Sequence, residues 1–461
     1  MQSALLDFLF NTEKSLMARR NRRRQKLPQD PVEIQIESLS HDGRGIARLD
    51  GKTIFIDGAL AGETVKFLYT KKHSKYDEAK TIEVVVSENT DRVEPKCQHF
   101  GLCGGCSLMH MSPEAQLRLK QKTLEEHLGH FGKIEPQNWL EPLRGPLWGY
   151  RRKARLGVKH VPKKERVLVG FREKGTPYLA VLEKCEVLDQ RVGTRLAELG
   201  EMIATLEAHN RIAQIEVAMD DEHVALIFRN LDPLSEQDQR ALIEYGQSHD
   251  LWIYLQSGGP DTVTAIWPEN PQLSYAPEQG LQLDFEPNDF TQVNAGINLK
   301  MIERTMELLD ISADDRILDL FCGLGNFTLP LAKRVTEVVG VEGDEALVRH
   351  ARDNANKNDL SNATFEQADL TQTELKDYPW AAAGFNKILL DPPRSGAFEV
   401  LHQLAALGAE RLVYVSCNPA TLARDAGELV NNHGYTLVST GVMDMFPHTT
   451  HVESIALFIK Q

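Results

Sequence analysis

The sequence lacks any apolar run of the roughly 18 residues that a membrane-spanning helix needs. It also lacks the order of a secretory signal peptide, because its basic stretch follows the weakly apolar start instead of preceding it. Six cysteines in 461 residues are too few for a disulfide scaffold. The 42% apolar and 26% charged residues are ordinary for a globular protein, which excludes collagen and a mostly disordered chain. We therefore expect a cytoplasmic protein of two to four domains that does not associate with membranes.

Net positive charge is also absent, since the chain carries a formal charge of −14, and this alone argues against a nucleic-acid partner. The charges are unevenly distributed, however. Residues 1–174 hold 32 Lys and Arg against 22 Asp and Glu, a net of +10, whereas residues 175–461 hold 20 against 44, a net of −24. A basic front half is typical of a protein that binds RNA or DNA, although a solvated charge bias would give the same count. Within it, we expect the basic run at 151–155 to contact phosphate groups.

Changes of pattern along the chain predict a multidomain α+β protein in four segments. Residues 1–27 form a basic arm. Residues 28–90 contain about five short strands between Gly and Asp turns, which suits a small closed barrel of the OB type. Two runs within them, DGRGIAR and GALAGETV, resemble a TRAM domain, an RNA-binding barrel. Residues 91–290 alternate strands and helices after a cysteine-rich loop, with a helix at 112–131 that is a candidate to pack on the last domain. Residues 291–461 repeat a β-α pattern typical of a doubly wound, mainly parallel sheet.

The last domain begins with a strand, a Gly-rich turn and a helix, ILDLFCGLGNFTLPLA. Gly323 and Gly325 would let the backbone approach a ligand closely, and Glu342, at the end of the next strand, could accept hydrogen bonds from a ribose. The turn lacks the third glycine of GxGxxG, which argues against NAD. Together with Asp369, which follows a later strand, these residues resemble the cofactor site of class I S-adenosylmethionine (SAM) methyltransferases, so we expect SAM to bind here.

Two further motifs, DPPR at 391–394 and VSCNP at 415–419, follow apolar strands and should lie at the same edge of the sheet. DPPR lacks the aromatic residue that ends the (D/N)PP(Y/F) loop of amino-methyltransferases, since Arg394 stands there. A cysteine beside a methyl donor solves one particular problem. C5 of uracil is too poor a nucleophile to attack a methyl group, but a thiolate that adds to C6 produces an enolate whose C5 can attack it.

Five stretches, FTQVN, LDLFCGLGNF, LLDPPR, VSCNP and HVESIALF, together resemble the RNA uracil-C5 methyltransferases, and the resemblance covers nearly the whole chain. It implies that Cys417 is the nucleophile and that Glu453 is the base that removes the C5 proton. It also implies that Asp391 serves either SAM or the uracil. The residues expected to line the pocket for SAM and the target base are Gln292, Phe321, Asn326, Glu342, Asp369 and Asp391.

Four cysteines outside this site form a triplet, C-x5-C-x2-C, and a distant fourth position: Cys97, Cys103, Cys106 and Cys185. Four thiolates can hold either zinc or an iron–sulfur cluster, and the spacing does not choose between them. The resemblance to the family favours the iron–sulfur cluster. Ribosomal-RNA members of the family carry a 4Fe-4S cluster at a matching set of cysteines, whereas the tRNA members lack both the cluster and the TRAM barrel.

The resemblance therefore implies a central α/β iron–sulfur domain in a monomeric enzyme. The implied reaction is SAM-dependent methylation of C5 of one uridine in 23S rRNA. Two alternatives remain. One is the same reaction at another rRNA site or on tRNA, and the other is a non-catalytic iron–sulfur protein that binds RNA.

Overall fold

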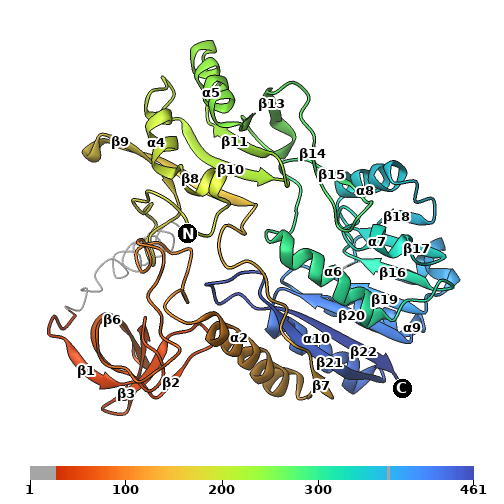
Figure 1. The fold of residues 1–461 in the computed structure, drawn as a ribbon. Helices are drawn as coiled ribbons and strands as arrows, with labels where there is room; N and C mark the ends of the chain where they lie inside the picture. Colours follow the sequence, from red (N-terminus) through yellow and green to blue (C-terminus); the bar gives the residue numbers. More distant parts are fainter. Residues whose placement is uncertain (1–26, 371–373) are drawn as a thin grey trace, which may run out of the picture. The chain divides into compact units, whose positions relative to one another are not determined.

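The computed structural model describes residues 27–370 and 374–461, and the chain divides into two compact units, Met1–Arg92 and Val93–Gln461 (Figure 1). The basic arm predicted at the N-terminus lies outside the described residues apart from Leu27. None of the described helices is long and apolar enough to cross a membrane.

The first unit is a six-stranded sheet around a small core of its own. Every second side chain of β4, namely Ile54 and Ile56, is buried, which is the period-two pattern that predicted a strand here. The unit has one strand more than the sequence predicted, because the two-residue β2 pairs with β3. The strand order is β1-β5-β6-β4-β3-β2. The strands are β1 (Val32–Gln35), β2 (Ser38–Leu39), β3 (Gly45–Leu49), β4 (Lys52–Asp57), β5 (Thr64–Lys72) and β6 (Tyr76–Val86).

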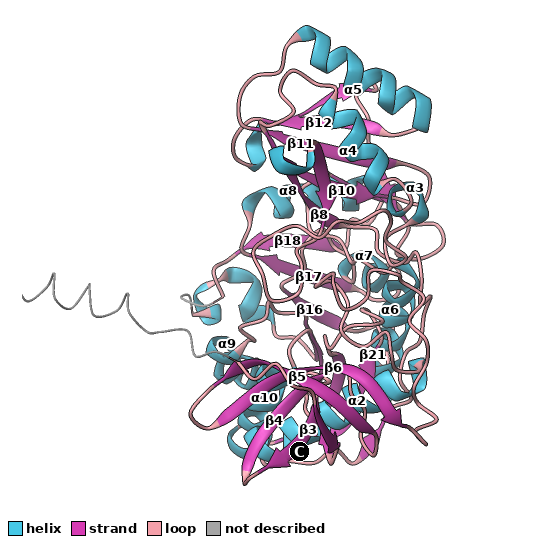
Figure 2. Cartoon of the chain, turned by 90° about the vertical axis from the view of Figure 1, so that its left-hand side faces the viewer, coloured by secondary structure: helices cyan, strands magenta, loops and turns pink. Residues whose placement is uncertain are grey.

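The second unit contains two large sheets. The central sheet has the order β13-β12-β11-β10-β8-β9, and the helices α4 and α5 share one hydrophobic core with one of its faces (Figure 2). Its strands are β8 (Ala154–Val161), β9 (Arg166–Gly170), β10 (Ile212–Met219), β11 (Val224–Asn230), β12 (Trp252–Gln256) and β13 (Val263–Trp267). Its helices are α3 (Gln190–Gly193), α4 (Leu196–Ala204), α5 (Glu236–His249), η2 (Pro162–Lys164) and η3 (Pro260–Thr262). A separate pair, β14 (Leu273–Tyr275) and β15 (Leu283–Phe285), leads to the second sheet.

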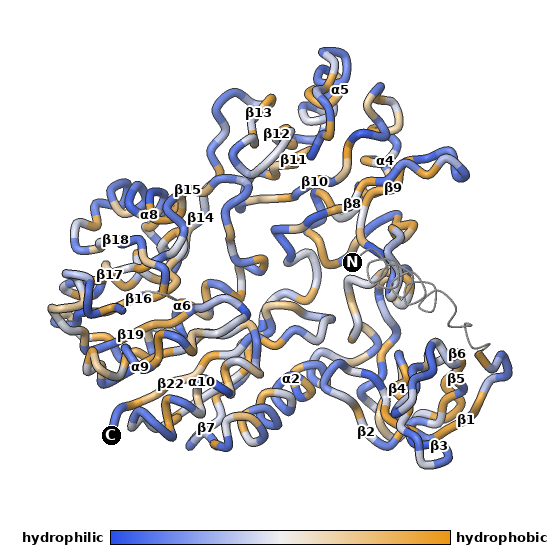
Figure 3. The backbone as a smooth tube through the Cα atoms, turned by 180° about the vertical axis from the view of Figure 1, so that it is seen from behind, coloured by the Kyte–Doolittle hydropathy of each residue, from blue (hydrophilic) through white to orange (hydrophobic). Residues whose placement is uncertain are grey.

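The second sheet has eight strands in the order β18-β17-β16-β19-β20-β22-β21-β7, and β22 runs antiparallel to both of its neighbours. Hydrophobic residues run along β16, β19 and β22 (Figure 3), as expected for strands covered on both faces. One face shares a core with α9 and α10 and the other with α6. The prediction of a doubly wound, mainly parallel sheet is confirmed. The strands are β7 (Asn138–Trp139), β16 (Arg316–Leu320), β17 (Glu337–Glu342), β18 (Ala363–Gln367), β19 (Lys387–Leu390), β20 (Arg411–Ser416), β21 (Tyr435–Met443) and β22 (Glu453–Lys460).

The helices of this sheet come from two distant parts of the chain. α2 (Pro113–His127) and η1 (Leu128–Gly132) pack on α10, and Leu117, Leu124 and Leu128 belong to the same core as its Leu422 and Leu429. α2 begins at the N-cap Ser112, whose side chain accepts a hydrogen bond from the backbone N–H of the third helical residue. The remaining helices are α6 (Ala295–Leu309), α7 (Thr328–Ala332), α8 (Glu345–Lys357), η4 (Leu375–Asp377), η5 (Pro379–Ala383), α9 (Phe398–Ala406) and α10 (Pro419–Asn432).

We expect Gly427→Ala to destabilise the protein although the residue lies within a helix. Alanine has a better helix propensity by about 1 kcal/mol. A Cβ at Gly427 would, however, lie 2.8 Å from the backbone oxygen and 2.9 Å from the Cα of Gly132, so overpacking of about 1–3 kcal/mol outweighs that gain. The control is Gly129→Ala in η1, where a Cβ meets nothing within 4 Å. Denaturant unfolding should show a lower midpoint for the first variant only, and equal midpoints would contradict the close packing of α10 on η1.

Candidate active site

The carboxyl ends of the parallel strands β16 to β20 share one edge of the second sheet. Phe321 follows β16, Glu342 ends β17, Asp391 follows β19 and Cys417 follows β20. Asp369 stands two residues beyond the end of β18. The fold therefore brings five of the predicted site residues to one edge, as the strand-end rule indicated.

The Gly-rich turn after β16 has an unusual backbone and holds the acid of β17. Phe321, Gly323 and Gly325 have φ values of 65°, 54° and 90°, a left-handed region that glycine adopts without strain. The N–H of Gly323 donates to Glu342 Oε2 at 3.1 Å, and the N–H of Gly343 donates to Oε1 at 2.7 Å. Both oxygens of Glu342 are thus oriented by backbone donors, which fixes the carboxylate beside the Gly-rich turn.

Asn326 ties this turn to α6. Its Oδ1 accepts hydrogen bonds from the hydroxyl of Tyr275 at 3.0 Å and from Nδ2 of Asn298 at 2.9 Å, and its own Nδ2 donates to Oδ1 of Asn298 at 3.0 Å. Gln292 is half-buried in the segment just before α6, whose N-cap is Asn294. The reciprocal pair of amides fixes Asn326, and with it the Gly-rich turn, against α6.

The side chains of the basic run at 151–155 lie in different surroundings. Nζ of Lys153 points inward and donates to the backbone oxygens of Asp289 and, at 3.2 Å, Pro287. Burial lowers the pKa of Lys153 to about 8. Arg155, in contrast, has a side chain that is 75% exposed. Lys153 instead holds the segment that leads to Gln292, a role that sequence periodicity cannot distinguish from a surface lysine.

The pairing of β20 with β22 brings the predicted nucleophile and base together. Ser416, the last residue of β20, lies opposite Ser454, the second residue of β22. Because the pair is antiparallel, the next position along the register sets Cys417 beside Glu453. Residues that are 36 positions apart in the sequence thereby face one site, and the register of one strand pair decides it.

Burial and like charges dominate the electrostatics of this site. Burial, followed by the nearby carboxylates of Glu453 and Asp391, raises the pKa of the Cys417 thiol to about 11, and the Arg394 guanidinium opposes them. Burial raises the pKa of Asp391 to about 7. Burial and Asp391 raise the pKa of Glu453 to about 8, against Arg394 and Lys120. A carboxyl that titrates near neutral pH can both take up and release a proton during a reaction.

Two cationic residues of this site were missed from the sequence. Arg394 lies beside His451, with Nη2 3.1 Å from Nδ1, and its place in DPPR was the only signal of its role. Lys120 of α2 is 1% exposed and forms an ion pair with Asp444 at 2.7 Å. No sequence signal marked Lys120, because a lysine on an amphipathic helix usually faces solvent.

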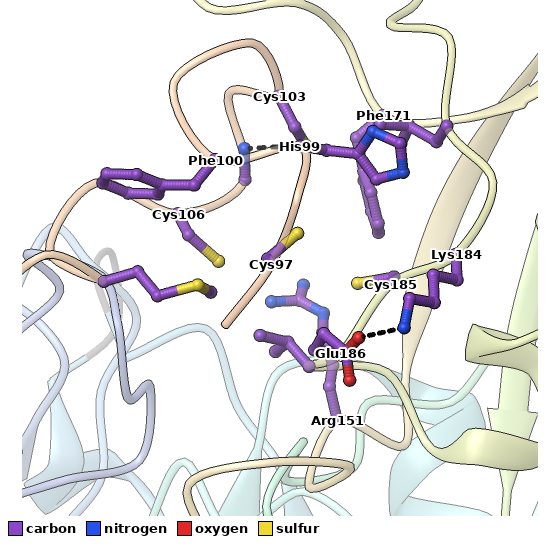
Figure 4. Close-up of a pocket in the computed structure, with 14 residues that line it drawn as sticks. Cys97, His99, Phe100, Cys103, Cys106, Arg151, Phe171, Lys184, Cys185 and Glu186 are labelled. Carbon is purple, nitrogen blue, oxygen red and sulfur yellow. Dashed lines mark hydrogen bonds and ion pairs between the residues drawn. The ribbon is translucent and has the colours of Figure 1, made fainter. Parts of the chain in front are cut away.

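The four predicted ligand cysteines, Cys97, Cys103, Cys106 and Cys185, line one cavity of about 250 Å³ (Figure 4). The side chain of Arg151 points into the same cavity. Burial raises the pKa of Cys103, Cys106 and Cys185, and the neighbouring cysteines raise it further. A backbone N–H donates to the sulfur of Cys103 at 3.4 Å. Within the described ranges, no three His, Cys, Asp or Glu side chains are close enough together to hold a single metal ion.

Comparison with known proteins identifies the family. The model of the tRNA (uracil-5-)-methyltransferase family matches residues 112–461, and the model of the TRAM domain matches residues 30–82, which confirms the predicted N-terminal domain. A 23S rRNA (uracil(1939)-C(5))-methyltransferase, RlmD, of Nitrosococcus oceani is 57% identical over 95% of this chain and 98% of its own. The protein of the same name from Alkalilimnicola ehrlichii is 55% identical over 95% and 99%.

One solved structure covers the chain almost completely. It is the tRNA (uracil-54, C5)-methyltransferase of Pyrococcus abyssi in complex with S-adenosyl-L-homocysteine, with a TM-score of 0.72 and 24% identity over 93% of this chain and 100% of that one. At this identity the likeness shows a common fold.

The reactivity of Cys417 should report the charges around it. With a thiol pKa of about 11, the thiolate fraction rises tenfold per pH unit through neutral and moderately alkaline pH. At pH 9, above the pKa of about 8 of Glu453, Glu453→Gln removes a negative charge that raises the pKa of the thiol, so alkylation of Cys417 by iodoacetamide should be severalfold faster. Arg394→Gln removes the opposing cation and should make it slower. Mass spectrometry of the Cys417 peptide measures both rates, and a slower reaction in Glu453→Gln would refute the arrangement.

Proposed function

The chain belongs to the tRNA (uracil-5-)-methyltransferase family, and from this membership we propose that it transfers the methyl group of SAM to C5 of uridine 1939 in 23S rRNA. Relatives named for this reaction are 57% and 55% identical over nearly their whole length. The observation that carries the proposal is the position of Cys417 beside Glu453 at the edge of the sheet where Glu342 and the Gly-rich turn lie. The TRAM domain supports an RNA substrate.

In the proposed reaction, the Cys417 thiolate adds to C6 of the uracil, and the electrons of the C5–C6 double bond move into the C4 carbonyl as an enolate. SAM supplies the methyl group, which C5 takes up as S-adenosylhomocysteine leaves. The carboxylate of Glu453 then accepts the C5 proton. The electrons of the C5–H bond restore the double bond and expel the thiolate of Cys417 from C6, so that the free enzyme returns after Glu453 loses its proton.

The electrostatics of the site suit the proton transfer to Glu453 and oppose the ionisation of Cys417. A pKa of about 8 puts Glu453 close to neutral pH, so it accepts the C5 proton and returns it to solvent with little cost. The Arg394 guanidinium favours the thiolate of Cys417 but does not outweigh burial, Glu453 and Asp391, which leave the pKa of the thiol raised to about 11. We assign the SAM-binding role to five residues, with Asp391 shared between SAM and the uracil: Gln292, Phe321, Asn326, Glu342 and Asp369.

We further propose that the four cysteines of the cavity hold a 4Fe-4S cluster. Four thiols from two segments of the chain face one space, and Arg151 provides a positive charge beside ligands that are anionic when they bind iron. The methyl transfer itself requires no electron transfer, so the cluster would order the surrounding loops. The enzyme is proposed to act as a monomer in the cytoplasm, where it would meet ribosomal RNA.

Covalent trapping tests the proposed reaction. An RNA that carries 5-fluorouridine at the target position should leave Cys417 bonded to C6 after methyl transfer, because fluorine cannot be removed as a proton is. Cys417→Ala should abolish both the adduct and turnover. Glu453→Gln should retain addition and methyl transfer but slow product release by about 10²–10⁴-fold, the usual contribution of a general base.

The adduct is detected as a complex that survives denaturing electrophoresis, and peptide mapping identifies the bonded cysteine. Uridine RNA without fluorine serves as the control. An adduct formed by Cys417→Ala would refute the assignment of the nucleophile.

Metal analysis tests the cluster. Protein purified without oxygen should contain about four irons per chain. Cys97→Ser should lose that iron together with soluble yield, whereas Cys322→Ser, in the Gly-rich turn, should keep it. Stoichiometric zinc in place of iron would contradict the 4Fe-4S assignment and leave the methyl-transfer proposal standing.

A further inference from the structure

The loop between β21 and β22, residues 444–452, delivers Glu453 to the active site, and we call it the base loop. It is held by a buried ion pair with α2, a helix near the start of the second unit in the sequence. Nζ of Lys120 lies 2.7 Å from Oδ1 of Asp444 and donates to the backbone oxygen of Phe446 at 2.9 Å. The side chains of Lys120 and Asp444 are 1% and 3% exposed. One ammonium group thus fixes the first and third residues of the base loop.

Further hydrogen bonds hold the middle of the base loop. The N–H of His448 donates to Oε1 of Gln116 at 2.7 Å, and the hydroxyl of Tyr150 donates to the backbone oxygen of Pro447 at 3.1 Å. The backbone N–H groups of Ser107 and Leu108, next to the cysteine triplet, both donate to the backbone oxygen of His448 at 2.9 Å. His448 has a φ of 68°, a costly conformation for a side chain of this size that persists only where surrounding contacts impose it.

A contribution to the stability of the fold does not by itself explain why the buried ion pair of Lys120 and Asp444 is present. Removing two charges from water costs about as much as their attraction returns, and well-packed apolar residues often replace such a pair without loss. Its placement, in contrast, serves the site, because the Lys120 cation is close enough to Glu453 to oppose the burial that raises its pKa. The other charged or titratable groups that act on Glu453 or lie beside it are Asp391 and Arg394 after β19 and Cys417 after β20.

We propose that Lys120 is a positioning residue for the base: through its ion pair with Asp444 it fixes the base loop, so that Glu453 stands where it can remove the C5 proton. The inference rests on the proposed function. It predicts that the ion pair is needed for release of the methylated product more than for SAM binding or for the attack of Cys417, because those steps use groups on other loops.

The test uses a double variant that carries both Lys120→Met and Asp444→Asn, so that no buried charge is left unpaired. This double variant is compared with a matched control on the same helix. The control is Lys122→Met with Glu126→Gln, whose ion pair at 3.7 Å is exposed. With full-length protein, SAM and uridine RNA, rapid quenching measures methyl transfer, the covalent adduct and free product. We expect the buried variant to accumulate methylated adduct and to release product about 10²-fold more slowly, the effect of a displacement of about 1 Å.

Two further readouts separate positioning from a general loss of structure. SAM affinity measured by calorimetry should be unchanged in the buried variant. The pH at which release becomes half-maximal on the acid side should stay near that of the wild type, because the Lys120 cation and the Asp444 anion are removed together and the loss of rate is one of position. The control should match the wild type in every measurement.

Each result decides the matter. Release at the wild-type rate would overturn the inference, as would equal losses of SAM binding, adduct formation and release. If the double variant does not fold, Tyr150→Phe replaces it, since this change removes a hydroxyl that donates to the base loop at Pro447. It should slow release with SAM affinity intact, and normal release would overturn the inference. If the wild type transfers no methyl group to the uridine RNA, the proposed function fails and this inference fails with it.

Discussion

The antiparallel pairing of β22 between β20 and β21 is the interaction on which the active site depends. It places the first residue of β22, Glu453, beside the residue that follows β20, Cys417. A slip of one residue would turn the side chain of Glu453 to the opposite face of the sheet. Ser454, Ile455 and Ala456 are all buried, so both faces of β22 are packed and a slip would force side chains of a different size into each packed position. The chemistry of the site is in this sense a consequence of strand pairing.

Burial sets the electrostatic character of the site in the absence of substrate. The Cys417 thiol and the carboxyls of Asp391 and Glu453 all have pKa values raised mainly by burial. Two cations, Arg394 and Lys120, oppose this effect from different directions. One lies on the loop after β19, and the other lies on α2, which precedes β16 by about two hundred residues in the chain. Such a balance is what a site needs if one group must lose a proton to attack and another must accept one near neutral pH.

The central sheet supports the Gly-rich turn after β16 through a shared core. Ala225 and Tyr254 of the central sheet pack in one cluster with Phe285 of β15 and with Cys322 and Leu324 of the Gly-rich turn. The segment after Tyr150 connects the cysteine cavity to the region of Gln292. Arg151 lines the cavity, and Lys153 holds the backbone that leads to Gln292. A loss of order around the four cysteines would therefore also disorder the base loop and the segment that precedes α6.

The sequence by itself determined the alternation of strands and helices, the TRAM domain and the residues at the strand ends. Parallel strands send their carboxyl ends to one edge, so Phe321, Glu342 and Asp391 could be placed near Cys417 by a local rule. Local rules do not extend to partners that only the tertiary structure brings together. Lys120 and Asp444 lie 324 residues apart, and the inward direction of Lys153 depends on the carbonyl groups opposite it. The pKa values were equally undetermined, because desolvation depends on the whole surrounding volume, which no pattern of neighbouring residues encodes.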